Sequence, residues 1–435
     1  MQNIKIIMIF LVIGLKANAQ EILELDRAIE IALKNNYSII IAKNDALLAK
    51  TNNTLGNAGF LPNVGLNFGQ TENINDTRQV FFNGEVREGD NVTISNMNSN
   101  LQLQWTIFDG FHMFATRNML EEFEKIGELN ARIRIDETIS QVIGTYYAIV
   151  QKQKQILAIK NAIEISTERK RIAEERLAIG SSSGLEALQA SVDVNADSSA
   201  LLRQEFDLIN TKAALNELLA RGPEIAFAVT DAIVMGGVLK YEELLQKTQL
   251  QNPELLIAQR NTRIADLSLR QARSSILPTV SVVSGLHYNT MEAQIGILQS
   301  NVNRGVNYGL TASWTIFNGF TQKTRRQVAQ IEIMNNDMAR HQSELRIKNE
   351  LYQLYIAYVT SKSLVDIEQK NLNVAQRNLN VSTERMKLGA INALELREAQ
   401  RSLIDAEFRL IMAEYEAKLT ETELLRLSGQ LILPG

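Results

Sequence analysis

Two long stretches of the chain carry the hydrophobic spacing of helices. From about His112 to Ala178 and from about Thr321 to Lys387, no proline and no firm turn signal interrupts the sequence. In the first stretch, apolar residues recur at alternating spacings of four and three, as in a coiled-coil seam. The seam residues are Ile135, Ile139, Val142, Tyr146, Ile149 and Ile156. A helix over 112–178 would be roughly 100 Å long, so it must bury its apolar stripe by packing laterally against other helices.

Four shorter stretches alternate between apolar and polar residues, which is the pattern of strands with two different faces. Their apolar positions are Val64, Leu66 and Phe68; Leu101, Leu103, Trp105 and Ile107; Val280, Val282, Leu286 and Tyr288; and Val306, Tyr308, Leu310, Ala312, Trp314 and Ile316. One face should therefore contact an apolar medium and the other water. The intervening residues are mostly small and uncharged, which is typical of the lining of a water-filled barrel. For any single strand, the alternative is an ordinary sandwich strand that faces a protein core.

The same unit occurs twice along the chain. Residues Leu103–Phe111 match Ala312–Phe320 at an offset of 209, and both tryptophans of the chain lie in this motif. Nearer the start of each unit the offset is 216, where Phe60–Pro62 matches Ile276–Pro278. The first unit therefore has additional residues between Pro62 and the tryptophan motif, and we expect them in a loop.

Each unit is predicted to contain a helix, a β-hairpin, a long helix, a turn and a final helix. The first repeat covers 20–221, with its hairpin at about 61–109, its long helix at about 112–178 and its final helix at 185–221. A linker follows at 222–238. The second repeat covers 239–429, with its hairpin at about 277–318, its long helix at about 321–387 and its final helix at 394–428, before a tail at 430–435.

The first nineteen residues have the pattern of a signal peptide. Lys5 precedes the apolar run 6–15, and Ala17 and Ala19 are small residues at the −3 and −1 positions of a cleavage site. The run is shorter than the ~20 residues of a membrane-spanning helix, which argues against the alternative of an uncleaved anchor. We therefore expect a signal peptide at 1–19 and a mature protein beyond the inner membrane.

Composition excludes several classes of function. The precursor has a net charge of −4, and no clustered basic face indicates nucleic acid as a partner. Cysteine is absent, which excludes disulfides, thiol catalysis and the lipid-bearing cysteine of a lipoprotein. The three histidines are widely separated, and neither a phosphate-binding loop nor a nucleophile elbow is present. We therefore expect no enzyme activity and no catalytic, cofactor or metal site.

Four strands are too few to close a barrel, and an open sheet edge is not tolerated in lipid. Closure therefore requires strands from other copies of the chain. Aromatic residues cluster where the strands give way to helices, as in the girdle of a barrel at a membrane interface. They are Trp105, Phe108, Phe111, Trp314, Phe317 and Phe320. The alternative is that these rings cap a soluble core.

Taken together, these features resemble the TolC-like family of outer-membrane efflux proteins over essentially the whole mature chain. The resemblance is carried by the tandem repeat, a Leu-Pro before each hairpin, the Trp-x-(Ile/Leu)-Phe-(Asp/Asn)-Gly motif and the paired helical turns at 176–190 and 385–399. It implies a mainly α fold in which long coiled-coil helices form an α-barrel. Four strands from each subunit would then contribute to a twelve-stranded trimeric β-barrel.

The resemblance also implies a function and its partners. Family members are homotrimeric exit ducts in the bacterial outer membrane, with a large periplasmic part. They accept cargo through a periplasmic adaptor from an inner-membrane pump such as an RND or ABC transporter, or serve type I secretion. The barrel would stay open, and the far end of the helical tunnel would open and close. The alternative, a periplasmic coiled-coil scaffold or adaptor without a pore, does not explain the two-faced strands.

The resemblance assigns roles to residues at the helical turns. The grooves around Ile179, Gly180 and Ser181, and around Leu388, Gly389 and Ala390, would receive the tip of the adaptor. Glycine also fits a tight helix reversal, because it tolerates positive φ angles.

An acidic ring at the tunnel entrance would contain Glu186, Glu395 and Glu398, and would favour cations. The alternative is that these are solvated glutamates paired with Arg397 and Arg401. Ile391 occupies a position where the best-known members have an arginine that helps to close the entrance, so we expect a different latch here.

Overall fold

The computed structural model describes residues 21–181, 183–230 and 232–431. The predicted signal peptide at 1–19 and residues 432–435 of the tail lie outside the described residues. The chain divides into two compact units that cut across the two sequence repeats. The helical unit contains Ile135–Lys247 with the described parts of Met1–Ile40 and Glu350–Gly435, and the sheet unit contains Ile41–Arg134 and Thr248–Asn349.

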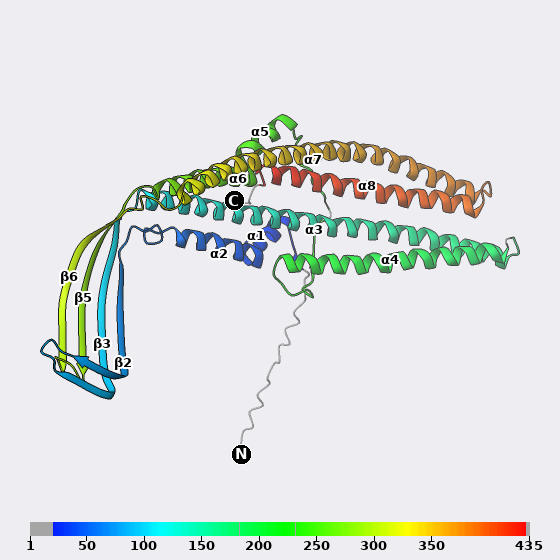
Figure 1. Ribbon diagram of the computed structural model, residues 1–435. Helices are drawn as coiled ribbons and strands as arrows, with labels where there is room; N and C mark the ends of the chain where they lie inside the picture. The colour runs from blue at the N-terminus through cyan, green and yellow to red at the C-terminus, as the bar shows by residue number, and fades with distance from the viewer. Residues whose placement is uncertain (1–20, 182, 231, 432–435) are drawn as a thin grey trace, which may run out of the picture. The chain divides into compact units, whose positions relative to one another are not determined.

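The helical unit is formed by long helices and one very small sheet (Figure 1). It holds α1 (Leu25–Asn35), the later part of α3 (His112–Ala178), α4 (Gly184–Leu218), α5 (Tyr241–Gln251), the later part of α7 (Thr321–Lys387) and α8 (Ala393–Leu427). Strand β1 (Glu21–Ile22) pairs in parallel with β4 (Phe227–Ala228). None of the described helices has an apolar stretch long enough to cross a membrane.

The core of the helical unit confirms the predicted seam. Ile139, Val142 and Ile149 of α3 are at most 1% exposed and pack with Leu215 and Phe227. Tyr146, the other fully buried seam residue, donates a hydrogen bond through its hydroxyl to the carbonyl of Leu23 at 3.0 Å. The long helix is therefore stabilised by lateral packing, as its hydrophobic pattern requires.

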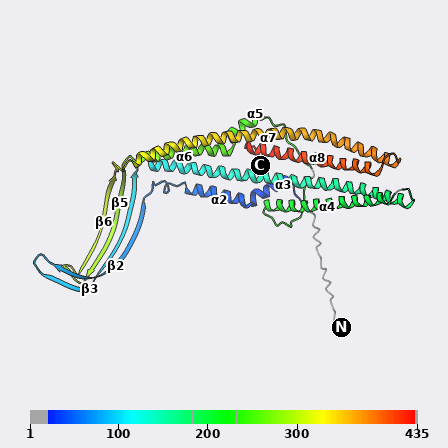
Figure 2. The same ribbon diagram turned by 45° about the vertical axis from the view of Figure 1, so that its right-hand side comes forward.

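The sheet unit combines helices with one four-stranded antiparallel sheet (Figure 2). Its helices are most of α2 (Tyr37–Asn52), α6 (Pro253–Ser274) and the earlier parts of α3 and α7. Its strands are β2 (Asn63–Val80), β3 (Val86–Phe108), β5 (Thr279–Ala293) and β6 (Ser300–Ser313), in the order β2-β3-β5-β6. The predicted fold class, mainly helical with four strands in one sheet, is confirmed.

Two details of the strands differ from the sequence-based expectation. Strand β6 ends at Ser313, so Trp314 and Ile316 lie beyond it despite the alternating pattern. The additional residues of the first repeat do not form a longer loop. They lengthen β2 and β3 to 18 and 23 residues, against 15 and 14 in β5 and β6.

The register gives the sheet one apolar and one polar face. Leu66 lies opposite Leu101, which lies opposite Leu286, which in turn lies opposite Val306. All four side chains in this row are exposed, from 39% at Leu101 to 70% at Leu66. Nothing in the described part of the subunit covers the apolar face, so the sandwich alternative is wrong.

Candidate functional site

The two long helices end in the same backbone motif. Gly180 and Gly389 have φ angles of 73° and 71°. The N–H of Ser181 donates to the carbonyl of Arg176 at 2.8 Å, and that of Ala390 donates to Arg385 at 2.9 Å. This is the Schellman arrangement, in which a left-handed glycine ends a helix. No atom lies within 4 Å of an added Cβ at either glycine, so backbone conformation rather than space favours glycine here.

Large apolar side chains surround these turns and are exposed. Ile179 and Leu388, the residues before the two glycines, are 79% and 82% exposed. Leu394 at the start of α8 and Leu185 at the start of α4 are 76% and 63% exposed. Exposed apolar side chains gathered at one place are typical of a surface that contacts a partner.

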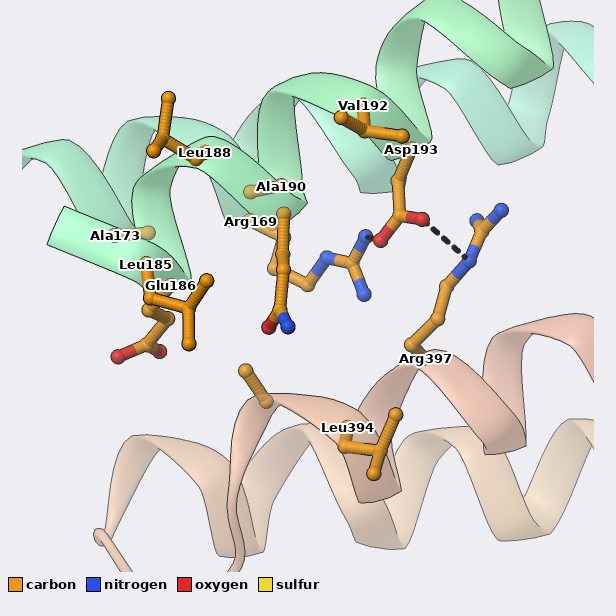
Figure 3. Close-up of a pocket in the computed structure, with 12 residues that line it drawn as sticks. Arg169, Ala173, Leu185, Glu186, Leu188, Ala190, Val192, Asp193, Leu394 and Arg397 are labelled. Atoms are coloured by element: carbon orange, nitrogen blue, oxygen red, sulfur yellow. Dashed lines mark hydrogen bonds and ion pairs between the residues drawn. The ribbon is translucent and has the colours of Figure 1, made fainter. Parts of the chain in front are cut away.

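A cavity of about 430 Å³ lies between the first turns of α4 and α8 and a turn of α3 (Figure 3). Its apolar lining includes Leu185, Leu188 and Leu394, and Glu186 lies at the same site. A second, larger groove of about 750 Å³ lies between the last turns of α3 and α7, where Ile165 and Leu379 contribute apolar surface. The helical tip therefore offers two grooves between elements of the two repeats.

The other two glutamates of the predicted acidic ring are exposed on α8. Asn392 caps this helix by accepting a hydrogen bond from the backbone N–H of Glu395 at 2.9 Å. Among the residues that the structure describes, the side chains of Glu395 and Glu398 form no ion pair with Arg397 or Arg401. The pairing part of that alternative is therefore absent, while both side chains are solvated in the subunit, and the acidic ring stays a prediction.

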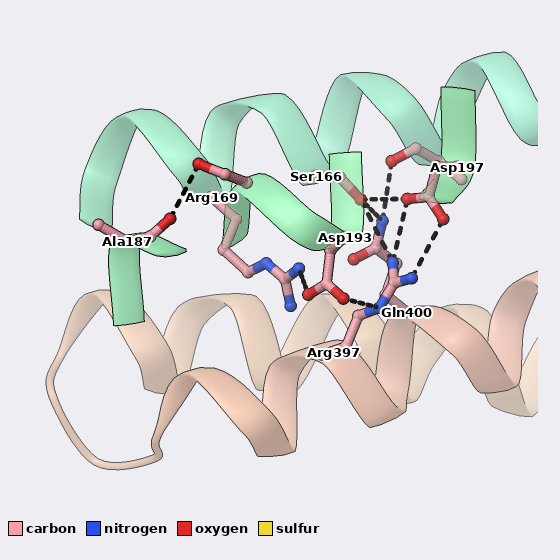
Figure 4. A network of polar contacts seen from close by, with 9 residues as sticks. Ser166, Arg169, Ala187, Asp193, Asp197, Arg397 and Gln400 are labelled. Atoms are coloured by element: carbon pink, nitrogen blue, oxygen red, sulfur yellow. Dashed lines mark hydrogen bonds and ion pairs between the residues drawn. The ribbon is translucent and has the colours of Figure 1, made fainter. Parts of the chain in front are cut away.

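Arg397 instead joins a polar network that connects the two repeats (Figure 4). Its guanidinium donates to both carboxylate oxygens of Asp197, each at 3.1 Å, and its Nε lies 3.5 Å from Asp193. Asp193 also pairs with Arg169, whose side chain is 5% exposed. Two arginines and two aspartates thus balance in charge, as partly buried ionic groups require.

Uncharged groups complete the network. Ser166 of α3 donates to Asp197 at 2.6 Å, while fully buried Gln400 of α8 donates to the Ser166 hydroxyl and to the Ala162 carbonyl, each at 2.8 Å. The network therefore connects α3 and α4 of the first repeat to α8 of the second.

Burial by itself would lower the pKa of Arg397, but the hydrogen bond and the charge of Asp197, with the charge of Asp193, raise it overall. The guanidinium therefore stays charged over the whole pH range in which the two aspartates are ionised.

Sequence reasoning missed this network, although a signal was present. At the offset of 209, Arg397 corresponds to Leu188, Asp193 to Ser402 and Asp197 to Ala406. The network thus lies at positions where one repeat is charged and the other is not.

The predicted aromatic residues form two equivalent joints between strand and helix. The indole N–H of Trp105 donates to the carbonyl of Phe60, and that of Trp314 donates to Ile276, both at 2.9 Å. Each tryptophan therefore ties the end of its hairpin to the segment that precedes it.

Two aromatic pairs complete the joints. The rings of Phe108 and Phe111, and those of Phe317 and Phe320, meet edge to face at 5.4 Å. Five of the six rings are more than 40% exposed, so they do not cap a core within the described subunit.

Amide side chains dominate the polar face of the sheet. The register places these residues on it: Asn63, Asn67, Asn73, Asn75, Asn96, Asn98, Asn100, Gln102, Gln104, Asn289, Asn301, Asn303 and Asn307. Between the helical end of the sheet and the register shift at Asp76, no paired residue of this face is Asp, Glu, Lys or Arg, and His287 is the one titratable side chain there. No group of three or more potential metal ligands occurs in the described part of the chain.

Comparison with known proteins gives consistent matches. The model of the outer membrane efflux protein family matches residues 28–221 and 244–430. The chain is 22% identical to protein CyaE of Bordetella pertussis over 87% of this chain and 78% of CyaE. It is 21% identical to the probable outer membrane lipoprotein SilC of Salmonella typhimurium over 93% of this chain and 86% of SilC. The solved CmeC outer membrane channel of Campylobacter jejuni shares the fold, with a TM-score of 0.79 and 16% identity over 94% of this chain and 86% of CmeC.

The substitution Arg397→Gln tests whether the network holds the two repeats together. It leaves Asp197 partly buried without its charged partner, which should destabilise the tip by about 1–3 kcal/mol. We expect faster amide hydrogen exchange at the adjoining ends of α4 and α8. Arg401→Gln, which removes the same charge from an exposed site one turn further along α8, should leave exchange unchanged. Equal exchange in both variants would show that the network is not a structural link.

Proposed function

The chain belongs to the outer membrane efflux protein family, and from this we propose that three copies form an exit duct fed by a periplasmic adaptor and an inner-membrane pump. The protein is an efflux channel of the outer membrane, with a periplasmic helical part. The alternative of a periplasmic scaffold without a pore is therefore rejected. The trimer, the docking surface and the acidic entrance are the parts of this proposal that go beyond family membership.

The observation that carries the proposal is the exposed apolar row across the sheet, backed by an amide-rich face. In lipid, the outer edges of β2 and β6 would leave backbone groups without hydrogen bonds, at a cost of several kcal/mol each. Pairing β6 of one copy with β2 of the next satisfies those groups. Three copies give a closed wall whose apolar side faces lipid and whose amide side faces water, with the aromatic joints as its interfacial girdle.

The amide-rich face of the sheet, called the amide wall below, is suited to letting cargo pass rather than to selecting among cargo molecules. Asparagine and glutamine both donate and accept hydrogen bonds, so the wall can replace water around cargo of either charge. A passage must also bind its cargo weakly enough to release it. We therefore infer that discrimination by charge occurs at the helical tip, where Glu186, Glu395 and Glu398 of each copy would line the entrance.

The tip is also the proposed docking surface for the adaptor. Its exposed apolar residues, among them Ile179 and Leu388, lie beside two grooves that a helical hairpin of the adaptor could enter. The pump would be of the RND or ABC type.

The latch at this tip differs from that of the best-known relatives. Ile391 packs against a cluster that includes Leu379, Met386 and Leu396, and Ile165 of the first repeat joins it. An apolar contact therefore occupies the position of their arginine. We infer that the polar network around Arg397 supplies the charged restraint between the two repeats.

Opposite faces of β3 offer a test of the closed wall. Leu101→Lys places a charge on the proposed lipid face, which should cost about 2–4 kcal/mol near the middle of the bilayer. We expect a loss of the heat-sensitive trimer band from outer-membrane fractions. Asn100→Lys, at the neighbouring residue on the amide face, should assemble normally. A similar loss in both variants would argue against the assignment of the two faces.

The acidic entrance is tested by removing its charge. The double substitution Glu395→Gln with Glu398→Gln should weaken the block of single channels by multivalent cations added on the periplasmic side, because the local negative potential falls. The matched control is Glu242→Gln with Glu243→Gln, which removes the same charge at the start of α5. Unchanged block in the first variant would remove these residues from the entrance.

Docking at the tip is tested at Gly389. Gly389→Trp should abolish efflux while the trimer remains, because a bulky ring would occupy the proposed docking surface. Gly389→Ala adds similar backbone strain, roughly 1–2 kcal/mol, without the bulk, and should retain efflux. Loss of efflux in both variants, or loss of the trimer, would assign the glycine a purely structural role.

A further inference from the structure

The outer end of the β2–β3 hairpin is bent. Strands β2 and β3 continue to pair as far as Val80 and Val86, well past the last residue of β5. The register shifts at Asp76, and Asn91 opposite has a φ angle of 53°. The N–H of Asn91 donates to the Asp76 carboxylate at 2.9 Å. A β-bulge of this kind turns a strand, and the hairpin end crosses the ends of β5 and β6 (Figures 1 and 2).

The bend is directed towards the amide face. Val92 lies opposite Asn75 on that face, yet it is only 3% exposed. Gly89 of the bent segment covers it, since an added Cβ at Gly89 would come within 2.8 Å of Val92 and 2.3 Å of Ile295. The segment therefore folds over the side of the sheet that lines the proposed channel, and a larger residue at position 89 would displace the side chains of Ile295 and Val92.

Several contacts hold the bent segment in place. Arg87 donates to the carbonyl of Gly296 in the β5–β6 loop at 2.9 Å, and its guanidinium lies over the ring of Phe81. The backbone N–H of Thr93 donates to the side chain of Gln294 at 3.0 Å, and the N–H of Gln294 donates back to Thr93 at 3.3 Å. The bend is thus a fixed part of the sheet unit.

The tip of the bent hairpin exposes apolar side chains. Phe82 is fully exposed, and Val80 is 67% exposed. Burying an aromatic ring that is otherwise left in water is favourable, so such a ring at a tip favours contact with a partner. The ring of Phe81 is stacked under Arg87. Of the two aromatic rings at the tip of the hairpin, Phe82 is therefore the one without a cation–π contact within the described subunit.

Geometry identifies the partner. From Asp76 to Phe82 the hairpin extends roughly 20 Å, at ~3.3 Å per residue. A barrel of twelve strands, spaced ~4.8 Å apart and tilted by ~40°, has a backbone radius of roughly 12 Å. A hairpin bent inward at the rim is therefore long enough to reach the barrel axis, where it meets the same hairpin of the other copies.

We propose that the bent hairpins of three copies meet over the outer mouth through Phe82 and Val80 and form a cap that narrows the outlet. This inference rests on the trimeric duct proposed above, and it departs from the expectation that the barrel stays open. The partner of each tip is another copy of this chain. The cap would exclude large external solutes at rest and yield to cargo that moves outward, because only the tips make contact.

Cross-linking tests the cap directly. The natural chain has no cysteine, so Phe82→Cys introduces one thiol per subunit at an exposed site whose replacement should not disturb folding. After mild oxidation of outer-membrane fractions, we expect disulfide-linked dimers when the trimer is heated. Phe68→Cys is the control, since this residue is also exposed, at 67%, but lies on the apolar face of the same hairpin away from its tip and should not cross-link.

Single-channel conductance gives a second test of the cap. The double substitution Phe82→Ser with Val80→Ser should raise single-channel conductance roughly twofold, and should admit neutral polymers that the natural channel excludes. A trimer that neither cross-links at position 82 nor changes in conductance would overturn the cap and leave the duct intact. Absence of any trimer would instead overturn the duct itself, and the cap with it.

Discussion

The unpaired edges of the four-stranded sheet are the constraint on which the rest of this structure depends. Strands β2 and β6 have 18 and 14 residues, and each presents a row of backbone groups that has no partner within the sheet. Water could satisfy these groups, but lipid cannot. Because the protein lies in the outer membrane, the proposed duct closes by pairing these edges with other copies. In that arrangement the apolar face would point outward and the amide face inward.

The sequence was informative where burial sets a simple period. The seam of α3 and the alternation of the strands both reflect which side chains leave water, so both could be predicted from the local sequence alone. The residues at which the strands end could not be predicted in this way. The same Trp-x-Ile-Phe pattern remains in the ladder as far as Phe108 in β3, but leaves it after Ser313 in β6. The two strands differ in their place in the sheet: β3 pairs with a strand on each side, whereas β6 is an edge strand that pairs with β5 alone. The local sequence pattern does not show which strand lies at an edge.

The tip illustrates the same limit for site residues. The glycine turns were predictable, because a helix reversal needs a positive φ angle that only glycine adopts cheaply. The network around Arg397 was not, because its partners lie on helices about two hundred residues apart in the chain. The sequence shows this network only as a difference between the two repeats. Arg397 is charged, whereas its counterpart Leu188 is apolar, and Asp197 is charged, whereas its counterpart Ala406 is not. Equivalent residues of the two repeats face different neighbours, so a charge can be matched at one of them only.

This pairing also shapes the electrostatics of the proposed entrance. Arg397 lies on α8 between Glu395 and Glu398, and as a free side chain it would offset their charge. Because Asp193 and Asp197 neutralise it, its field largely cancels at the distance of the two glutamates. The aspartates therefore do more than fasten two hairpins: they leave the adjacent carboxylates as a negative site. In the proposed duct, the amide face of the sheet would therefore release cargo passively, and the acidic site on α8 would select by charge.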